Sequence, residues 1–381
     1  MDNNKKITAI DLFAGCGGLS LGFAQAGFDV LLGIDADEAA LKTYAYNHKN
    51  SKALNLDLSS EEAIETIASE LGTTKLDLII AGPPCQGFSL TGSRDINDTR
   101  NTLYLEVVKA VKRLKPTAFL IENVPGMATL YGGKVKEQII ATFEDMGYAV
   151  SVTDKPLLAA DYGVPQKRKR MFFVGFLKEY GQFEFPEPTN TPENYITTEM
   201  AISDLPSREN EFGEEMDKYT KSPLTDYQKL MRKDNTTTLY NHVATKHTEE
   251  VKWVISQVPE GGNYKDLPEG VGTSRKFNEA WTRYHSKKPS KTIDTGHRNH
   301  FHYEYNRVPT VRENARLQSF PDDFVFLGTR TQQNRQVGNA VPPILSYNLA
   351  KKIKQKFDDI ENDNIQLSSA DITTQISLNL N

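Results

Sequence analysis

Residues 11–23 read DLFAGCGGLSLGF. The first three of them are also the end of an apolar run, ITAIDLF, at residues 7–13. Glycines stand where this run gives way to a helix-like pattern: Gly15, Gly17, Gly18 and Gly22. Glycines at such a junction let the backbone turn tightly and approach a bound ligand closely. We therefore predict a β-strand, a ligand-binding turn and an α-helix in succession.

Two acidic residues favour a nucleoside as the ligand of this turn. Asp35 closes the second apolar run, and an acid at that place in a doubly wound fold binds ribose hydroxyls. Asp57 follows the expected third strand, where it would lie near an adenine. The turn is not a GxGxxG, because its sixth position is Ser20, so by itself it could hold a dinucleotide, another nucleoside or nothing. We expect an adenosine-containing cofactor, without a 2′-phosphate because no arginine closely follows Asp35.

Short apolar runs alternate with amphipathic stretches over roughly the first 180 residues. Such nearly continuous apolarity is typical of strands that are covered on both faces. Residues 59–71 and 135–147 each carry one apolar helical face, and Ser59 with Glu62 predicts a capping box. The strand-like runs are 7–13, 29–35, 76–82, 118–124 and 170–176. This order predicts an α/β fold of the Rossmann-like kind, with a mostly parallel sheet between helices.

The texture of the sequence changes after Gly181, where a proline-rich stretch leads into about a hundred polar, irregular residues. A helix should begin after Pro343, because proline is tolerated in a first helical turn, and its apolar residues should return it to the first domain. The boundaries that we expect are 1–182 for the first domain, 183–325 for a smaller irregular domain, 326–360 for the returning segment, and 361–381 for a polar, frayed tail.

Charge is distributed unevenly along the chain. The net charge is −5, so the total does not indicate a nucleic-acid partner. Residues 285–316, however, hold seven Lys or Arg against three acids, and PQKRKR at 165–170 is a second basic cluster. A local basic face on an acidic protein can bind phosphates, although it can equally be solvated surface.

No stretch of about eighteen apolar residues appears, and the N-terminus lacks the apolar core of a signal peptide. The two cysteines, Cys16 and Cys85, are too few for a disulfide framework or an all-cysteine zinc site. We therefore expect no metal and a cytoplasmic, reducing setting. Cys16, inside the glycine turn, is expected to be a small packing residue.

Cys85 lies on a stiff turn, GPPCQGFS at residues 82–89, just beyond the run at 76–82. Ligands bind at the carboxyl edge of an open α/β sheet, where this turn should lie. Pro83 and Pro84 restrict the backbone before the thiol, and a polar segment follows it. A rigid thiol before a loop suits a nucleophile, although a cysteine can also be a buried, small hydrophobic residue.

Two further elements bring ionisable groups to the same edge. Glu122 lies among apolar neighbours near the end of the run at 118–124, so we expect it to be partly desolvated. Arg168 and Arg170 stand at the start of the next run, and their spacing places both on one side of a strand. A thiol, an acid and a pair of arginines form a set suited to attack on an electron-poor ring.

Six motifs, taken in order, resemble those of the DNA (cytosine-5)-methyltransferase family. They are DLFAGCGGLSLGF, GPPCQGFS, ENV, QKRKR, RENARLQSFPDDF and QVGNAVPP, and the resemblance extends over about residues 7 to 350. It implies a Rossmann-like, S-adenosylmethionine-dependent methyltransferase domain, with an irregular target-recognition domain before RENARLQSF. Asp35 stands where many relatives carry glutamate, and Ala340 where some carry serine.

The resemblance also implies a covalent mechanism. Cys85 would add to C6 of a cytosine flipped out of duplex DNA, which activates C5 to accept the methyl group. Glu122 would donate a hydrogen bond or proton at N3, and Arg168 would hold O2. Arg170 would support this geometry by pairing with the glutamate.

Cofactor and DNA sites follow from the same resemblance. The cofactor pocket would comprise Phe13, Gly15, Gly18, Asp35, Ala36, Asp57, Leu58, Pro84, Leu103 and Asn339. DNA contacts would come from Gln86, Ser89, Arg94, Arg100, Lys287, Lys288 and Arg298. The basic segment 285–316 would grip the phosphate backbone, while the second domain reads bases in the major groove.

Other functions fit the residues less well. Transfer-RNA cytosine-5 methyltransferases of similar sequence carry a Cys-Phe-Thr triplet in the recognition region, but no cysteine follows Cys85 here. A non-catalytic DNA-binding relative should have lost Cys85, Glu122 or Arg168, and all three are present. A nicotinamide dehydrogenase would leave the cysteine turn unexplained. We expect a bacterial, monomeric enzyme of a restriction–modification system, with a cognate endonuclease acting on the same DNA site.

Overall fold

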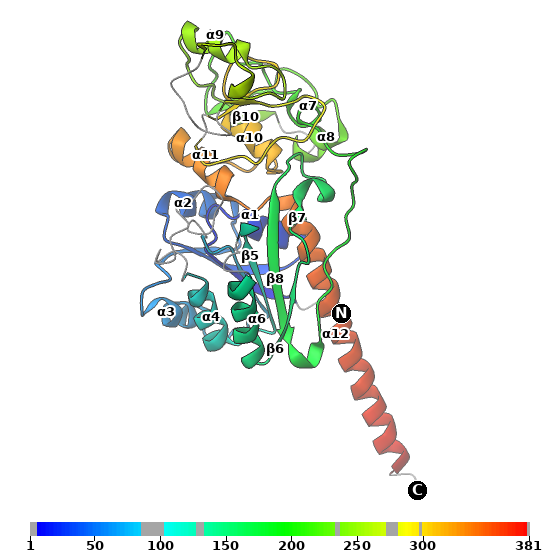
Figure 1. Cartoon of the computed structure of the whole chain (residues 1–381). Coiled ribbons are helices and arrows are strands. Elements are labelled where there is room, and N and C mark those ends of the chain that lie inside the picture. The colour runs from blue at the N-terminus through cyan, green and yellow to red at the C-terminus, as the bar shows by residue number, and fades with distance from the viewer. Residues whose placement is uncertain are drawn as a thin grey trace.

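The computed structural model describes residues 6–84, 103–126, 133–232, 237–271, 281–296 and 299–378, and it is built around one eight-stranded sheet (Figure 1). The strands are β1 (Thr8–Leu12), β2 (Asp29–Asp35), β3 (Lys52–Asn55), β4 (Leu78–Ala81), β5 (Ala118–Asn123), β6 (Tyr148–Val152), β7 (Leu157–Leu158) and β8 (Lys169–Leu177). Their order is β3-β2-β1-β4-β5-β8-β6, with β7 paired to β8. The first five strands pair in parallel, whereas β8 is antiparallel to its neighbours. The predicted α/β fold with a mostly parallel sheet is confirmed.

Alternate residues of the central strands face opposite layers, which explains why these strands are apolar throughout. In β1, Ile10 packs into one core cluster and Ala9 into the other. Neighbouring residues of β4, Ile79 and Ile80, divide in the same way. Helices α3, α4 and α6 cover the first layer, and α1 and α12 cover the second. The helices of this lobe are α1 (Gly18–Gln25), α2 (Glu38–Asn47), α3 (Ala63–Leu71), α4 (Leu103–Leu114), α6 (Lys134–Asp145) and α12 (Pro343–Leu378), with short 3₁₀ turns η3 (Ala159–Tyr162) and η4 (Lys178–Tyr180).

The predicted capping box at Ser59 and Glu62 is wrong. Helix α3 begins at Ala63, later than the sequence pattern suggested, and Glu62 stands at its N-cap without a side-chain hydrogen bond. The hydroxyl of Ser59 instead donates to Asp57 Oδ1 at 2.7 Å, and the Ser59 backbone N–H donates to the same atom at 2.9 Å. This local turn satisfies the serine before the helix starts.

A second lobe lies above the sheet in Figure 1 and is largely irregular, as predicted. Its elements are α7 (Thr198–Ile202), β9 (Met216–Lys218), α8 (Asp226–Arg232), β10 (Thr238–Tyr240), α9 (Glu249–Gln257), η5 (Tyr264–Asp266), β11 (Thr282–Arg283), β12 (His300–Phe301), α10 (Val311–Leu317) and α11 (Arg330–Asn339). Its apolar cluster includes Tyr227, Leu317 and Phe320 together with Cys16 of the glycine turn. The second lobe is therefore packed directly onto the first around that turn.

Helix α12 returns to the first lobe as expected, but it does not fray where the sequence suggested. Leu345, Leu349 and Ile353 pack into the core cluster shared with α1. The helix then continues to Leu378, beyond the body of the protein (Figure 1). The expectation of a frayed tail over most of 361–381 is wrong, because no proline or glycine follows Pro343 to interrupt the helix.

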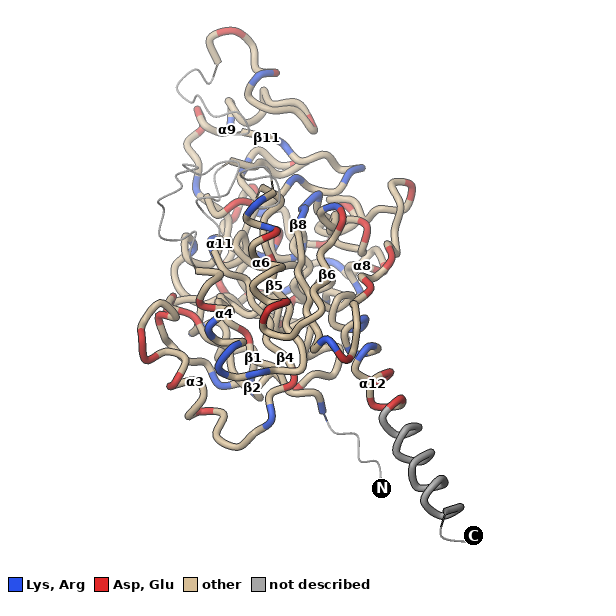
Figure 2. Tube along the Cα trace, turned by 60° about the horizontal axis from the view of Figure 1, so that its bottom comes forward, with Lys and Arg blue, Asp and Glu red and all other residues tan. Residues whose placement is uncertain are grey.

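No helix in the described part of the chain is long and apolar enough to cross a membrane. Basic and acidic residues are interspersed over the described chain in Figure 2, in keeping with a net charge of −5 that is not concentrated on one lobe.

Shortening a core side chain of α12 should destabilise the protein. We expect Leu349→Ala to lower the free energy of unfolding by about 2–5 kcal/mol, because the removed atoms leave a cavity against α1. Urea denaturation followed by circular dichroism measures this change. The exposed Gln355→Ala on the same helix should shift the free energy by less than about 0.5 kcal/mol. Equal stability of the two variants would contradict this packing of α12.

Candidate active site

A cavity of about 440 Å³ opens at the carboxyl edge of the parallel strands, beneath the second lobe. Its wall begins with the turn after β1 and continues with the ends of β2, β4 and β5. The start of β8 and the last turn of α11 close it. All ten residues predicted to hold the cofactor line this one cavity: Phe13, Gly15, Gly18, Asp35, Ala36, Asp57, Leu58, Pro84, Leu103 and Asn339. Three of the four predicted catalytic residues, Glu122, Arg168 and Arg170, line it as well.

Asp35 organises the rim of the cavity. Its Oδ2 accepts a hydrogen bond from the backbone N–H of Gly15 at 2.7 Å, and its Oδ1 accepts one from the N–H of Asp37 at 2.8 Å. Burial raises the pKa of the Asp35 carboxyl despite these bonds. Phe13, at the end of β1, adopts a φ of 60°, which is costly for a bulky residue and is typical of sites where function fixes the backbone. The turn and the β2 loop are therefore held together by one carboxylate.

Glu122 and Arg170 form an ion pair inside the cavity, through Arg170 Nε and Glu122 Oε1. Both side chains are largely buried, at 11% and 14% exposure. Arg170 also donates from Nη1 to the carbonyl of Lys169 at 2.8 Å. The geometric pairing expected for Arg170 is thus present, and it orients the carboxylate toward the cavity.

Arg168 has a different environment, although it lies only two residues away. It is 2% exposed, and two of its donors meet carbonyl oxygens: Nη2 lies 3.0 Å from Gly338 O and Nη1 lies 3.4 Å from Ile293 O. Its Nε has no partner among the described residues. Burial and the neighbouring Arg170 lower the pKa of the Arg168 guanidinium, while Glu122 opposes the shift. A buried cation with an unused donor is well suited to donate a hydrogen bond to a ligand oxygen.

Several predicted residues lie outside the described part of the chain: Cys85, Gln86, Ser89, Arg94, Arg100 and Arg298. Pro84, the residue before Cys85, lines the cavity. The nucleophile assignment therefore stays a prediction that the chain connection to the cavity supports.

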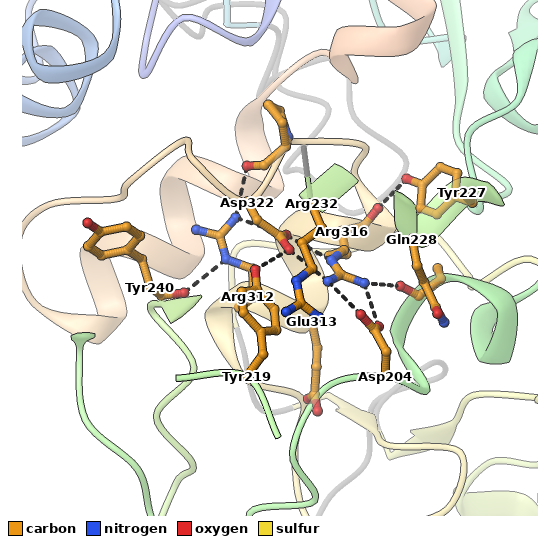
Figure 3. Close-up of polar contacts among 12 residues, drawn as sticks. Asp204, Tyr219, Tyr227, Gln228, Arg232, Tyr240, Arg312, Glu313, Arg316 and Asp322 are labelled. Atoms are coloured by element: carbon orange, nitrogen blue, oxygen red, sulfur yellow. Dashed lines mark hydrogen bonds and ion pairs between the residues drawn. The ribbon is translucent and has the colours of Figure 1, made fainter. Parts of the chain in front are cut away.

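The expectation that the whole basic segment 285–316 grips DNA is wrong. Arg307, Arg312 and Arg316 are buried in the second lobe. Arg316 pairs with Asp204 at 2.7 Å and with Asp322 at 2.7 Å, as Figure 3 shows.

The other two buried arginines are also satisfied within the second lobe. Arg312 donates to the carbonyls of Tyr240, Pro321 and Phe324. Arg307 binds Glu313 through two hydrogen bonds, of 2.6 and 2.8 Å. Burial opposes ionisation of Glu313, but Arg307 and His302 outweigh it and hold the pKa of that carboxyl well below its usual range. A count of charges cannot distinguish such internal pairs from exposed cations. The prediction that the whole of segment 285–316 binds DNA was wrong for this reason.

Lys287 and Lys288 remain exposed, as a DNA contact requires. Lys287 is paired with Glu199, at 2.5 Å. For Lys288, the structure gives no ion pair within the described residues. Lys288 is accordingly the better candidate of the two for a phosphate.

Sequence reasoning missed two groups in the cavity wall. Arg335 of α11 pairs with Asp37 at 2.6 Å and so joins the second lobe to the β2 loop. Asp11 is 1% exposed, and its Oδ2 accepts from the N–H and the hydroxyl of Ser20 at 3.2 and 2.6 Å. Burial raises the pKa of Asp11 to about 7, and its Oδ1 has no partner in the described structure. A carboxylate inside an apolar strand was the signal available in the sequence.

Comparison with known proteins assigns this arrangement to a family. The chain matches the family described as C-5 cytosine-specific DNA methylase over residues 7–355. The Type II methyltransferase M1.HphI of Haemophilus parahaemolyticus is 40% identical over 350 residues, which cover 91% of this chain and 86% of the relative. The Type II methyltransferase M.DdeI of Desulfomicrobium norvegicum is 38% identical over 376 residues, covering 92% and 89% of the two chains.

Solved structures agree with this assignment. An Escherichia coli prophage protein described as a DNA modification methyltransferase has a TM-score of 0.75 at 29% identity, covering 93% of this chain and 100% of that one. Spodoptera frugiperda DNMT2 shares the fold, with a TM-score of 0.57 at 16% identity over 91% of this chain and 99% of its own.

The chain therefore belongs to the C-5 cytosine-specific DNA methylase family. It is a DNA (cytosine-5)-methyltransferase, with DNA as substrate and S-adenosylmethionine as methyl donor.

The cavity fits this donor in size and charge. Its volume of about 440 Å³ lies within the range of small-molecule sites, roughly 300–1,000 Å³. S-adenosylmethionine carries a sulfonium and an ammonium group beside its adenosine, and five acidic side chains line the wall: Asp11, Asp35, Asp37, Asp57 and Glu122. The unpartnered Oδ1 of Asp11 adds an acceptor that a cationic ligand can use.

Replacing Asp11 by asparagine should change how stability depends on pH. Because the folded-state pKa of Asp11 is raised from 3.8 to about 7, the native protein holds a proton that the unfolded chain has lost between these values. The wild type therefore loses stability as pH rises from about 4 to 7, by up to about 1.4 kcal/mol per pH unit from this group. Asp11→Asn removes that contribution.

Urea titrations of both proteins at several pH values measure the difference. The stability of Asp11→Asn relative to wild type should increase from pH 4 to pH 7 and then level off. A constant difference across this range would show that Asp11 does not titrate as its burial implies.

Proposed function

We propose that this enzyme methylates C5 of one cytosine in a short, specific duplex sequence, with Cys85 as the nucleophile. The observation that carries the proposal is the convergence of the ten predicted cofactor residues with Glu122, Arg168 and Arg170 on one cavity. Pro84 in the same wall leads directly to Cys85.

The chemistry follows from what cytosine lacks. C5 is not nucleophilic until a thiolate adds to C6, which forms a C6–S bond and makes the ring an enamine. S-adenosylmethionine supplies the electrophilic methyl group, whose bond to sulfur breaks as the bond to C5 forms. The C5 proton then leaves to a base, for which water suffices, and elimination of the Cys85 thiolate restores the aromatic ring.

Protein groups stabilise charge during the addition. Glu122 would hydrogen-bond at N3, where electron density rises, and Arg170 would hold the carboxylate in place through the observed ion pair. Arg168 would direct its unused Nε donor at O2 of the ring. The two arginines would thus act differently: one positions the acid, and the other binds the base.

DNA must present the base outside the helix, because C6 cannot be reached within the stack. We place Lys287, Lys288 and Arg298 of the second lobe, and Gln86, Ser89, Arg94 and Arg100 of the segment after Cys85, at the DNA. The names of the relatives, Type II methyltransferases, favour a role in restriction–modification, with a cognate endonuclease cutting the same unmethylated site. A monomer acting on the chromosome, in the bacterial cytosol, accords with this role.

Substitution of the nucleophile tests the mechanism. Cys85→Ser should abolish transfer of tritiated methyl groups to duplex DNA, while binding of S-adenosylmethionine, measured by calorimetry, stays within about threefold. Duplex containing 5-fluorocytosine should form a denaturation-resistant adduct with the wild type and none with the variant, because fluorine cannot leave C5 as a proton does. Turnover by Cys85→Ser, or wild-type labelling of transfer RNA in place of DNA, would refute the proposal.

A phosphate contact at Lys288 predicts a change in salt dependence. Lys288→Ala should weaken binding similarly for specific and unrelated duplexes and reduce the slope of log K against log salt by about one. Fluorescence anisotropy at several salt concentrations measures the slope. Lys351→Ala, an exposed lysine on α12, is the matched control and should leave the slope unchanged. Identical slopes for Lys288→Ala and the control would remove Lys288 from the DNA interface.

A further inference from the structure

The chain that leads to Arg168 runs beside a segment of the second lobe. Residues 165–168 lie along residues 290–293, and Gln166 and Ser290 form a parallel bridge. The N–H of Lys167 donates to Ser290 O at 2.8 Å, and the N–H of Ser290 donates to Pro165 O at 2.9 Å. The residues just before β8 are therefore held by backbone hydrogen bonds to the second lobe.

A buried glutamine extends this connection. Gln166 is 0% exposed, and its Oε1 accepts from the N–H of Ile293 at 3.1 Å. Its Nε2 donates to Leu317 O at 3.2 Å and to the side chain of Gln318. Gln318 in turn donates from Nε2 to Ala340 O at 2.5 Å. One hydrogen-bonded unit thus joins the start of β8, helix α10 and the residues that follow α11.

Gly338 completes the unit and contacts Arg168 directly. Its carbonyl accepts a hydrogen bond from Arg168 Nη2 at 3.0 Å. The other hydrogen bond of this guanidinium runs from Nη1 to Ile293 O and is longer, at 3.4 Å. A Cβ at Gly338 would lie 2.5 Å from Asp294 O and 2.9 Å from Thr295 N, which no real side chain tolerates. Glycine is required here because the backbone of α11 touches the backbone of Asp294 and Thr295.

We propose that Gln166, Gly338 and residues 290–295 position the guanidinium of Arg168, so that the recognition lobe forms part of the catalytic centre. The proposal rests on the role of Arg168 at the target base proposed above. Within the described structure, the hydrogen bonds of this guanidinium go to the two carbonyls of this unit and to no carboxylate. Its direction therefore depends on where those carbonyls lie, and Gln166 and Gly338 are positioning residues.

Gly338→Ala tests the proposal by forcing the two backbones apart. A displacement of about 1 Å at a reacting group costs roughly 10²-fold in rate, so we expect a loss of this order in single-turnover methylation. Affinities for S-adenosylmethionine and for duplex DNA should stay within about threefold, because Arg168 would be misdirected rather than removed. Gln166→Met, which leaves the Ile293 N–H without its acceptor, should produce the same split between rate and binding.

A double-mutant cycle separates positioning from general damage. The Arg168→Lys variant keeps the charge but loses the fork of donors. Adding Gly338→Ala to this variant should slow the single-turnover rate by less than about threefold relative to Arg168→Lys alone. If the two losses instead multiply, Gly338 does not act through Arg168 and the proposal is overturned. If Arg168→Lys alone keeps the wild-type rate, the proposed function of Arg168 fails, which is a separate result.

Gln333→Met is the matched control, and it also protects the test against variants that only lose stability. Gln333 is a buried glutamine of α11 that donates to the carbonyls of Phe326 and Gly328, away from Arg168. Its replacement should lower Tm to an extent similar to Gln166→Met while leaving the single-turnover rate within threefold. A rate loss in Gln333→Met equal to that in Gln166→Met would overturn the assignment.

Discussion

The active site depends on one geometric constraint: hydrogen-bonded parallel strands of a single sheet end at the same edge. β1, β2, β4 and β5 satisfy this constraint, so the turn after β1, Asp35, Pro84 and Glu122 meet although up to 109 residues separate them in the sequence, from Phe13 to Glu122. The apolar runs that build these strands also fill both cores, because neighbouring residues face opposite layers. The strands that fill both cores therefore also form much of the wall of the cofactor cavity.

The direction of β8 decides whether its arginines can join them. A parallel strand would begin at the opposite edge, far from Glu122. β8 instead runs antiparallel to β5, with Glu122 opposite Phe172 in the register, so the chain just before that position lies at the carboxyl edge. The preceding connection, residues 153–168, holds only β7 and one short 3₁₀ turn, and lacks the helix that a parallel crossover uses. Arg168 and Arg170 reach the cavity for this reason.

Sequence reasoning succeeded where a residue sits at a fixed point of this topology. The strand ends, the glycine turn and the packing of Cys16, which is buried in the shared apolar cluster, follow from apolar runs and turn residues. It failed where the outcome depends on distant partners. The sequence predicted that Arg316 is an exposed cation. In the fold it is buried beside Asp204, which lies 112 positions earlier in the chain. Arg335 and Asp37 likewise meet only because α11 packs against α2 in the fold. The capping box failed for a local reason, since Asp57 competes for Ser59.

Arg168 and Arg170 show how the same side chain can serve two purposes. Arg170 forms an ion pair with Glu122, so its charge has a partner within the protein. Arg168 is more deeply buried than Arg170 but meets carbonyl dipoles, which offset the cost of burial less completely than a carboxylate would. The lowered pKa of its guanidinium reflects that incomplete compensation. Binding of an oxygen that gains negative charge would supply the missing compensation, so the site stabilises the reacting base most at the moment when charge develops on it.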